Sequence, residues 1–367
     1  MSDTPANPGL RHAGIRKACI TIPCPQLAPM LTFFLERLQF RVDAIFPADA
    51  PHTALISGYG LNLYLVQGPD AGPSTLRLLC DDPLRVAGGQ TELSAPNGMV
   101  IRFVHADPPM TIPPTQQALV ITEMQDNAHW GVGRAGMRYR DLLPDRHGGA
   151  FIASHIRLLQ GGPVADYVHY HKVRFQLIFC RKGWVRVVYE GQGEPFLLEE
   201  GDCVLQPPLI RHRVLESSAG AEVIEIGAPA QHITMADPDM TLPSAPLPPD
   251  HEFGGQRFVR SRKSQAVWTP WRLTGFEARD TGIANATDGL ASVRVVRNTS
   301  ETAGTGHSQD SEFCFFYVLS GQLQLELHGQ TRTLNADDSL TLPAGLPWRI
   351  STSSALEFLE VLLPAAD

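Results

Sequence analysis

Four residues between positions 169 and 212 could bind one metal ion together. His169 and His171 are two positions apart, so on a β-strand their side chains point to the same face. Gln176 follows five positions after His171, and a short bend would bring its amide beside the imidazoles. His212 lies on a separate predicted strand that begins after a turn at Gly201. Three imidazoles and one amide oxygen suit a divalent first-row metal ion such as Fe, Mn, Ni, Co or Zn.

The composition favours short strands joined by many turns. The 367 residues include 32 Gly and 30 Pro, whereas only 8% are aromatic, which predicts a mainly β chain of two or three domains. A net charge of −8 argues against nucleic acid and anionic membranes as partners. The sequence has no run of 18 apolar residues and no signal-peptide core in its first 18 residues. We therefore expect a cytoplasmic protein.

The six cysteines have no CxxC pair and no spacing typical of a disulfide framework. Cys180 and Cys203 lie within strand patterns, where a cysteine acts as a small hydrophobic residue. The cysteines therefore predict a reducing compartment.

The pattern around the four candidate ligands resembles the two motifs of the cupin superfamily, which are small jelly-roll β-barrels. The first motif has glycine, His-x-His, a glutamate and a second glycine, and the second has glycine, proline and histidine. The matching residues are Gly161, Gly162, His169, His171, Gln176 and Gly183 for the first motif, and Gly201, Pro207 and His212 for the second. This chain departs from the family pattern at Gln176, which replaces Glu, at Leu209, which replaces Gly, and at Glu216, which stands where Asn is usual. The resemblance implies a barrel that holds one metal ion through His169, His171, Gln176 and His212.

An internal repeat predicts a second barrel of the same kind. Residues 136–141 resemble residues 275–280, and the same offset, within a few residues, carries the first barrel onto the C-terminal third. His169, His171, Gln176 and His212 then correspond to His307, Gln309, Cys314 and Trp348. Tryptophan cannot bind a metal ion and would fill the space, so we expect a second barrel without a metal.

Two proline-rich segments, at 107–114 and 237–249, predict the domain boundaries. The domains would be residues 1–106, a first cupin barrel at 115–236 and a degenerate second barrel at 256–367. Residues 1–106 predict the order βαβββ, with a strand at 18–23, a helix at 26–38, strands at 40–46, 52–56 and 61–66, and further strands at 76–80 and 97–103. This order resembles one module of the glyoxalase, or vicinal-oxygen-chelate, fold. The positions that bind metal in that fold hold no good ligand here, so we expect a structural or substrate-shaping domain.

The residues around the candidate ligands predict the kind of molecule that would bind. Ile178, Cys180, Ile210 and Val214 would share the inward face and make an apolar cup, which suits a small organic ligand. Gln176 in place of a carboxylate leaves the site more positive, which favours an anion such as an enolate or keto acid. In an alternative interpretation, Gln176 only hydrogen-bonds a metal-bound water.

The resemblance to cupins leaves three functions open. The first is a metal-dependent enzyme of the dioxygenase or isomerase type that acts on an enolisable or aromatic acid, with no general base identifiable. The second is a non-catalytic small-molecule or metal-binding protein, such as a sensor or scaffold. The third is a metal-free deoxysugar epimerase, which the His-x-His, Gln and His set argues against. A monomer and a homodimer are both compatible with two barrels in one chain.

Overall fold

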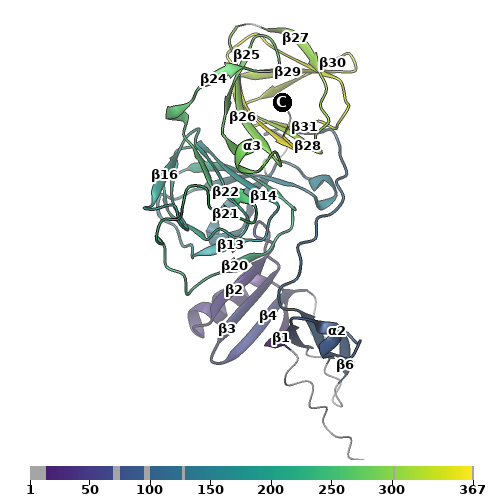
Figure 1. Cartoon of the computed structure of the whole chain (residues 1–367), viewed down its shortest axis with the longest axis vertical. Helices are drawn as coiled ribbons and strands as arrows, with labels where there is room; N and C mark the ends of the chain where they lie inside the picture. The colour runs from purple at the N-terminus through teal and green to yellow at the C-terminus, as the bar shows by residue number, and fades with distance from the viewer. Residues whose placement is uncertain (1–13, 69–74, 95–99, 126–128, 301, 366–367) are drawn as a thin grey trace, which may run out of the picture. The chain divides into compact units, whose positions relative to one another are not determined.

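A computed structural model describes residues 14–68, 75–94, 100–125, 129–300 and 302–365 (Figure 1). The chain forms two compact units. One contains the described residues up to Thr111 together with Ile233–Pro238, and the other contains Ile112–His232 and the described residues from Asp239 onward. Within these described ranges, no helix is both long and apolar enough to cross a bilayer.

The N-terminal unit is a mixed β-sheet with a helix against one face. Its strand order is β20-β2-β3-β4-β1-β5-β7-β6, with β1 parallel to β4 and β5 parallel to β7. Apolar side chains of the helix, including Leu27 and Phe34, pack on Ile56 and Leu65 of the sheet. The elements are β1 (Ile15–Cys24), α1 (Leu27–Thr32), the π-helical turn η2 (Phe33–Arg37), β2 (Arg41–Phe46), β3 (Thr53–Gly58), β4 (Leu61–Gln67), β5 (Thr75–Cys80), α2 (Pro83–Val86), β6 (Glu92–Ser94), β7 (Val100–His105) and β20 (Thr234–Ala236).

The predicted βαβββ order is present in this unit. The predicted helix at 26–38 corresponds to two elements in the structure. The first part is the α-helix α1, and the second part has π-helical geometry and forms η2. Residues 97–99 of the predicted strand at 97–103 lie outside the described residues, and the remainder belongs to β7. Strand β20 follows the first barrel in sequence and pairs with β2, where Met235 faces Ala44.

The first barrel consists of two antiparallel sheets. The larger has the order β23-β17-β14-β19-β11-β10-β9, and the smaller has the order β16-β15-β18-β13, with β12 also on β18. Their bounds are β9 (Gly131–Val132), β10 (Arg138–Asp141), β11 (Ile152–Leu158), β12 (Gly162–Pro163), β13 (His169–His171), β14 (Phe175–Lys182), β15 (Trp184–Tyr189), β16 (Phe196–Glu199), β17 (Cys203–Leu205), β18 (His212–Ser217), β19 (Ala221–Ala228) and β23 (Val259–Ser261).

Apart from β12, the second barrel repeats this strand order, which confirms the predicted internal repeat. Its larger sheet has the order β24-β25-β26-β33-β28-β31-β8, and its smaller sheet has the order β27-β32-β29-β30. The bounds are β8 (Val120–Thr122), β24 (Trp268–Pro270), β25 (Phe276–Asp280), β26 (Ser292–Asn298), β27 (Thr302–His307), β28 (Phe313–Ser320), β29 (Gln322–Leu327), β30 (Gln330–Asn335), β31 (Ser339–Thr341), β32 (Trp348–Thr352) and β33 (Glu357–Leu363). The predicted mainly β fold with two barrels in tandem and an N-terminal α+β module is therefore confirmed.

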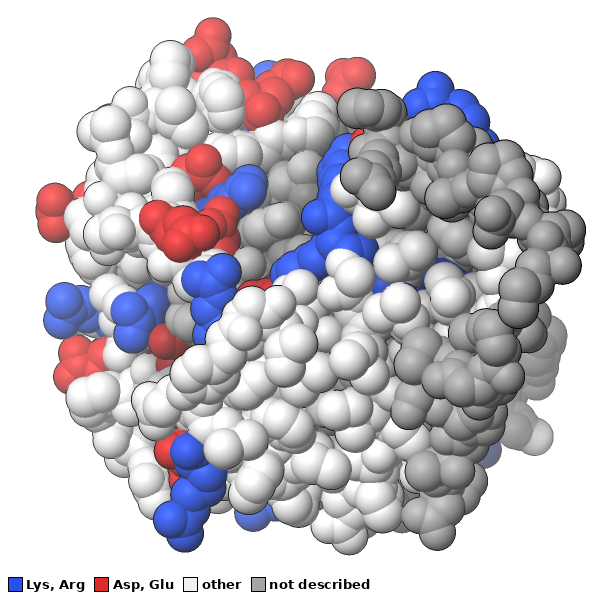
Figure 2. All heavy atoms as spheres, turned by 90° about the horizontal axis from the view of Figure 1, so that it is seen from below, with Lys and Arg blue, Asp and Glu red and all other residues white. Residues whose placement is uncertain are grey.

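Short elements connect these sheets. They are the 3₁₀ turns η3 (Arg134–Gly136), η4 (Arg146–Gly149) and η5 (Lys263–Gln265), the hairpin of β21 (Glu252–Phe253) and β22 (Gln256–Arg257), and α3 (Ile283–Ala286). All six cysteines are free and buried, as expected for small hydrophobic residues. Figure 2 shows a broad uncharged area on the described part of this face, with a group of Lys and Arg side chains beside it near the middle of the view.

The two barrels exchange edge strands and share one apolar core. Strand β8 precedes the first barrel in sequence but pairs with β31 of the second, whereas β23 precedes the second barrel but pairs with β17 of the first. Between the larger sheets, the rings of Phe151 and Phe313 stack with centroids 4.3 Å apart. Because each barrel completes a sheet of the other, we expect the barrels to unfold together.

A buried polar network also joins the barrels. Nε2 of His155 lies 2.7 Å from a carboxylate oxygen of Glu222, and Nδ1 of the same ring lies 3.3 Å from a guanidinium nitrogen of Arg140. From the second barrel, the hydroxyl of Tyr317 donates to Asp337 at 2.7 Å and lies 3.3 Å from His155 Nδ1. These partners suit a neutral imidazole that donates from Nε2 and accepts at Nδ1. Burial lowers the pKa of His155, and this effect outweighs the opposing effect of Glu222.

This network predicts that the free energy of unfolding decreases as the pH falls below about 6.5, the ordinary histidine pKa. The unfolded chain protonates His155 at that pH, whereas the folded chain resists protonation, so acid favours unfolding. His155→Gln keeps a donor and an acceptor but cannot titrate, so its melting temperature should vary less between pH 8 and pH 5. The control is His251→Gln at an exposed histidine, which should keep the wild-type slope. Equal slopes in all three proteins would contradict this assignment.

Candidate metal centre

The structure brings His169, His171 and His212 together inside the first barrel. The strand register pairs His169 on β13 directly with His212 on β18, and His171 lies two residues further along β13. One ligand nitrogen from each ring lies within 4.8 Å of those from the other two. All three side chains are buried.

Backbone carbonyls fix the orientation of two of these rings. Nδ1 of His169 lies 2.8 Å from the carbonyl oxygen of Tyr167, and Nδ1 of His212 lies 3.0 Å from that of Ile210. A carbonyl oxygen can only accept, so each Nδ1 carries the proton and each Nε2 presents a lone pair. In metal sites, a neutral histidine binds the ion through one ring nitrogen and donates a hydrogen bond from the other, which is the arrangement of these two rings.

Gln176 takes part in the site through a chain of amides. Its Oε1 accepts a hydrogen bond from Nε2 of Gln206 at 3.1 Å, and the same nitrogen of Gln206 lies 3.4 Å from Nε2 of His212. The amide nitrogen of Gln176 donates to Glu225 at 2.6 Å. Gln176 alone predicted a more positive site, whereas the structure places the carboxylate of Glu225 at hydrogen-bond distance from its amide. A negative charge at that position partly offsets the positive charge of a bound metal ion.

Three further residues beside the centre were not predicted from the sequence. Gln206 links Gln176 to His212 and accepts from the hydroxyl of Tyr189 at 2.6 Å. A carboxylate oxygen of Asp166 lies 3.6 Å from Nδ1 of His169. These residues have no motif spacing that would have marked them.

The third of these residues is His232. Its ring lies edge-to-face against His171, with centroids 5.3 Å apart. Nδ1 of His232 lies 3.1 Å from the carbonyl oxygen of Pro229, so Nε2 again presents a lone pair. This Nε2 is buried and has no hydrogen-bond partner among the described residues. A buried acceptor without a protein partner is costly, and it can accept a hydrogen bond from water or from a bound molecule.

The four residues predicted to form an apolar cup belong to one apolar cluster of the first barrel. Cys180 and Ile210 are buried in one apolar cluster, and Ile178 and Val214 pack against it. Glu216 lies away from this cluster, since it forms an ion pair with Arg186 and is 38% exposed.

Leu209 keeps the turn for which cupins use glycine. Its φ is 67°, in the left-handed region, and its backbone N–H donates to the carbonyl of His171 at 3.0 Å. Gly345 occupies the corresponding turn in the second barrel with a φ of 73°. A leucine in this conformation is strained. Its backbone hydrogen bond to His171 couples the conformation of this turn to the backbone of a candidate ligand.

The second barrel has tryptophan where the first has a ligand. His307 on β27 pairs in register with Trp348 on β32, as His169 pairs with His212. Trp348 is buried and lies against both His307 and Phe316. The amide of Gln309 is hydrogen-bonded to the backbone of Leu342 and Ser311. Within the described ranges, the three histidines of the first barrel are the only cluster of His, Cys, Asp or Glu with metal-binding geometry.

Comparison with known proteins supports this fold. Residues 294–362, within the second barrel, match the family model of the cupin domain. Salicylate 1,2-dioxygenase from Pseudoaminobacter salicylatoxidans, solved with gentisate, is similar at a TM-score of 0.52 and 15% identity, over 68% of this chain and 83% of that chain. Oxalate decarboxylase from Lactobacillus farciminis, solved with formate, is similar at a TM-score of 0.50 and 14% sequence identity, over 71% of this chain and 90% of that chain. No curated protein matches in sequence. The glyoxalase-like assignment of the N-terminal unit stays a prediction.

Proposed function

We propose that this protein is a metal-dependent cupin enzyme that acts on a small anionic organic acid in its first barrel. The observation that carries this proposal is the convergence of three buried imidazoles, two of which are held at Nδ1 by backbone carbonyls so that Nε2 is the acceptor nitrogen. Three neutral nitrogen ligands within 4.8 Å of one another fit a divalent first-row ion. His169, His171 and His212 would hold it, with Gln176 as a fourth ligand or as the partner of a bound water.

A metal ion at this position supplies Lewis-acid chemistry, and a redox-active one supplies one-electron chemistry as well. The chain's own residues orient the substrate. Nε2 of His232 can accept a hydrogen bond from a hydroxyl or enol group, because Nδ1 is already held by Pro229. The apolar side chains of Ile178, Cys180 and Ile210 can exclude water from the organic part of the substrate.

The structural relatives support the choice of an organic acid. The dioxygenase is described by its action on salicylate and was solved with gentisate, and the decarboxylase is described by its action on oxalate. Each of these acids is a small anion with oxygen atoms suited to chelation. We therefore infer a dioxygenase-type or isomerase-type reaction on an enolisable or aromatic acid.

A non-catalytic binding role is the second candidate. It is favoured by the loss of three of the four ligand positions in the second barrel, where Gln309 and Trp348 serve packing and backbone hydrogen bonds. A chain that needs only one intact site can use it to sense or store a ligand. Fold alone does not decide between the two roles.

The test begins with elemental analysis of the purified protein, followed by oxygen-uptake and absorbance assays with keto, enol and aromatic acids, gentisate included. An enzyme consumes oxygen or converts the acid, and His212→Ala abolishes the reaction. Tight binding without turnover of any acid supports the binding role instead. Absence of metal after reconstitution with iron, manganese, nickel, cobalt and zinc would reject the metal-dependent enzyme and leave metal-free binding of a small molecule as the role of this barrel.

Gln176→Glu should retain the metal but weaken the binding of an anionic acid by roughly tenfold or more, because it adds a negative charge close to the ligand. The substitution also removes the N–H that donates to Glu225 at 2.6 Å. The matched control is the exchange Gln176→Glu with Glu225→Gln, which preserves the hydrogen bond and the total charge. Calorimetric titration should show weak anion binding in the single variant and partial recovery in the exchange. Unchanged affinity in the single variant would place Gln176 outside the metal's ligands.

A further inference from the structure

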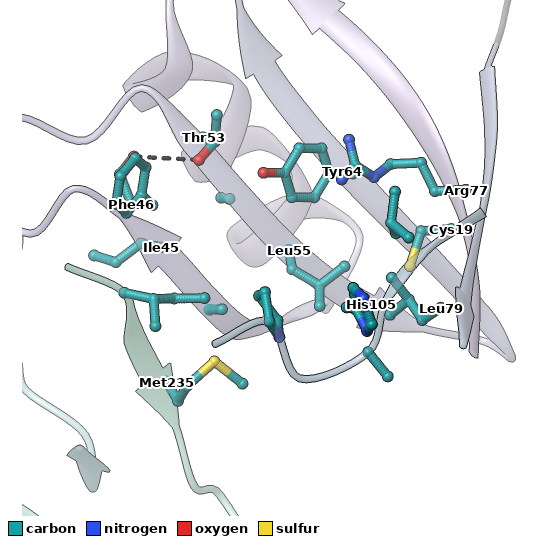
Figure 3. Close-up of a pocket in the computed structure, with 16 residues that line it drawn as sticks. Cys19, Ile45, Phe46, Thr53, Leu55, Tyr64, Arg77, Leu79, His105 and Met235 are labelled. Carbon is teal, nitrogen blue, oxygen red and sulfur yellow. Dashed lines mark hydrogen bonds between the residues drawn. The ribbon is translucent and has the colours of Figure 1, made fainter. Parts of the chain in front are cut away.

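The N-terminal unit contains a cavity of about 160 Å³ on the sheet face opposite its helix. Side chains alternate along β4, so Leu63 and Leu65 pack toward the helix while Tyr64 between them faces the cavity. Figure 3 shows Tyr64 and Leu55 in the middle of the cavity, with Phe46, Ile45 and Met235 toward one end and Arg77, Cys19, Leu79 and His105 toward the other. One end is therefore apolar, and the other carries the charged group.

The strand register explains why these residues line one cavity. Met235 of β20 pairs with Ala44 of β2, Ala44 pairs with Leu55 of β3, and Leu55 pairs with Tyr64 of β4. Directly paired residues point to the same face, so this row forms a continuous apolar floor. Strand β20, which comes from far along the chain, supplies the last member of the row.

Arg77 places a positive charge at the other end of this floor. It pairs in register with Cys19, and its guanidinium lies 4.6 Å from the centroid of the Tyr64 ring. Burial raises the pKa of the Cys19 thiol, so Cys19 is neutral and provides no counter-charge. The neighbouring Lys17 already forms an ion pair with Asp43 at 2.8 Å. In the part of the chain that the structure describes, no carboxylate forms an ion pair with Arg77.

We propose that this cavity is a second ligand site, which binds a monocyclic organic acid with its ring on the apolar floor and its carboxylate on Arg77. The volume of about 160 Å³ is close to the roughly 150 Å³ of an engineered apolar cavity that holds benzene. A half-buried guanidinium that has no ion-pair partner among the described residues can donate two parallel hydrogen bonds to a bound carboxylate. This inference does not depend on the function proposed for the first barrel, so either can fail without the other.

The test uses the full chain after metal removal with a chelator, so that a metal in the first barrel cannot bind the probe. Calorimetric titration with benzoate should show one site. Arg77→Gln should weaken benzoate binding at least tenfold, whereas Arg16→Gln, which removes an equal charge from an exposed side chain of β1, should not change it. Benzyl alcohol, which has the same ring without the charge, should bind the wild-type chain much more weakly than benzoate.

A second variant keeps the test decisive if Arg77→Gln folds poorly. Ala44→Leu adds volume to the floor without altering any charge, so it should abolish benzoate binding while circular dichroism stays native. Equal benzoate affinity in wild type and Arg77→Gln would overturn the proposal, as would equal affinity for benzyl alcohol. Absence of benzoate binding to the wild-type chain at millimolar concentration would also overturn it.

Discussion

Replacing His212 by alanine is expected to abolish stoichiometric metal binding. The residue pairs in register with His169, and one nitrogen of its ring lies within 4.8 Å of those of both other histidines. Its removal leaves two imidazoles and an amide, and a site opened to water holds a divalent ion far less tightly. We expect the metal content to fall from near one ion per chain to near zero, measured by elemental analysis at known protein concentration.

The matched control for this variant is His251→Ala, which removes an exposed histidine outside the barrel interior. It should retain the full metal content. His171→Ala should behave like His212→Ala, since both remove a ring from the same cluster. Circular dichroism separates loss of metal from loss of fold. Full metal content in both barrel variants would contradict the assignment of this centre.

The sequence was sufficient to locate the histidine cluster because its information is local. Two histidines at positions i and i+2 share a face of any strand, and the turn residues around His212 place the next strand beside them. The internal repeat was detectable for the same reason, since turn glycines such as Gly183 and Gly321 recur at a fixed offset. Both glycines have a positive φ, of 69° and 78°, which few other residues adopt readily.

The sequence was not sufficient for contacts between distant segments. Gln206 and His232 reach the histidines only because β14 lies between β17 and β19, an order that no local pattern encodes. The exchange of β8 and β23 between the barrels is hidden for the same reason. Each is a three-residue strand next to a proline-rich or irregular segment, and its partner is set by packing of the larger sheets rather than by its own residues.

The sequence also could not predict which charged residues lie behind the candidate ligands. The four predicted ligands are three imidazoles and one amide, so they carry no negative charge. In the cupin motif, a carboxylate is usual at the position of Gln176. The structure returns a carboxylate in Glu225, 49 positions away, at hydrogen-bond distance from Gln176. Glutamine in place of glutamate at position 176 therefore does not remove the negative charge from this region. The charge lies instead on Glu225, the hydrogen-bond partner of Gln176. This arrangement would leave the proposed metal ligands neutral while limiting the net charge of the buried region.

Replacing Trp348 by alanine is expected to destabilise the protein by about 3–5 kcal/mol, the usual cost of deleting a buried tryptophan side chain. Trp348 is 2% exposed and contacts the rings of His307 and Phe316. Its substitution should leave the metal content unchanged, because the centre lies in the other barrel. Urea unfolding gives the free energy, and elemental analysis on the same sample gives the metal content.

Trp348→Phe is the matched control, because it retains an aromatic ring and loses only part of the indole, including an N–H that has no hydrogen-bond partner among the described residues. It should cost much less than alanine. If alanine lowered the metal content while the chain stayed folded, the second barrel would have to support the first centre. His212 and Trp348 occupy the same register position in two barrels of one topology. Opposite outcomes at these two positions would show that one barrel uses this position for ligation and the other uses it for packing.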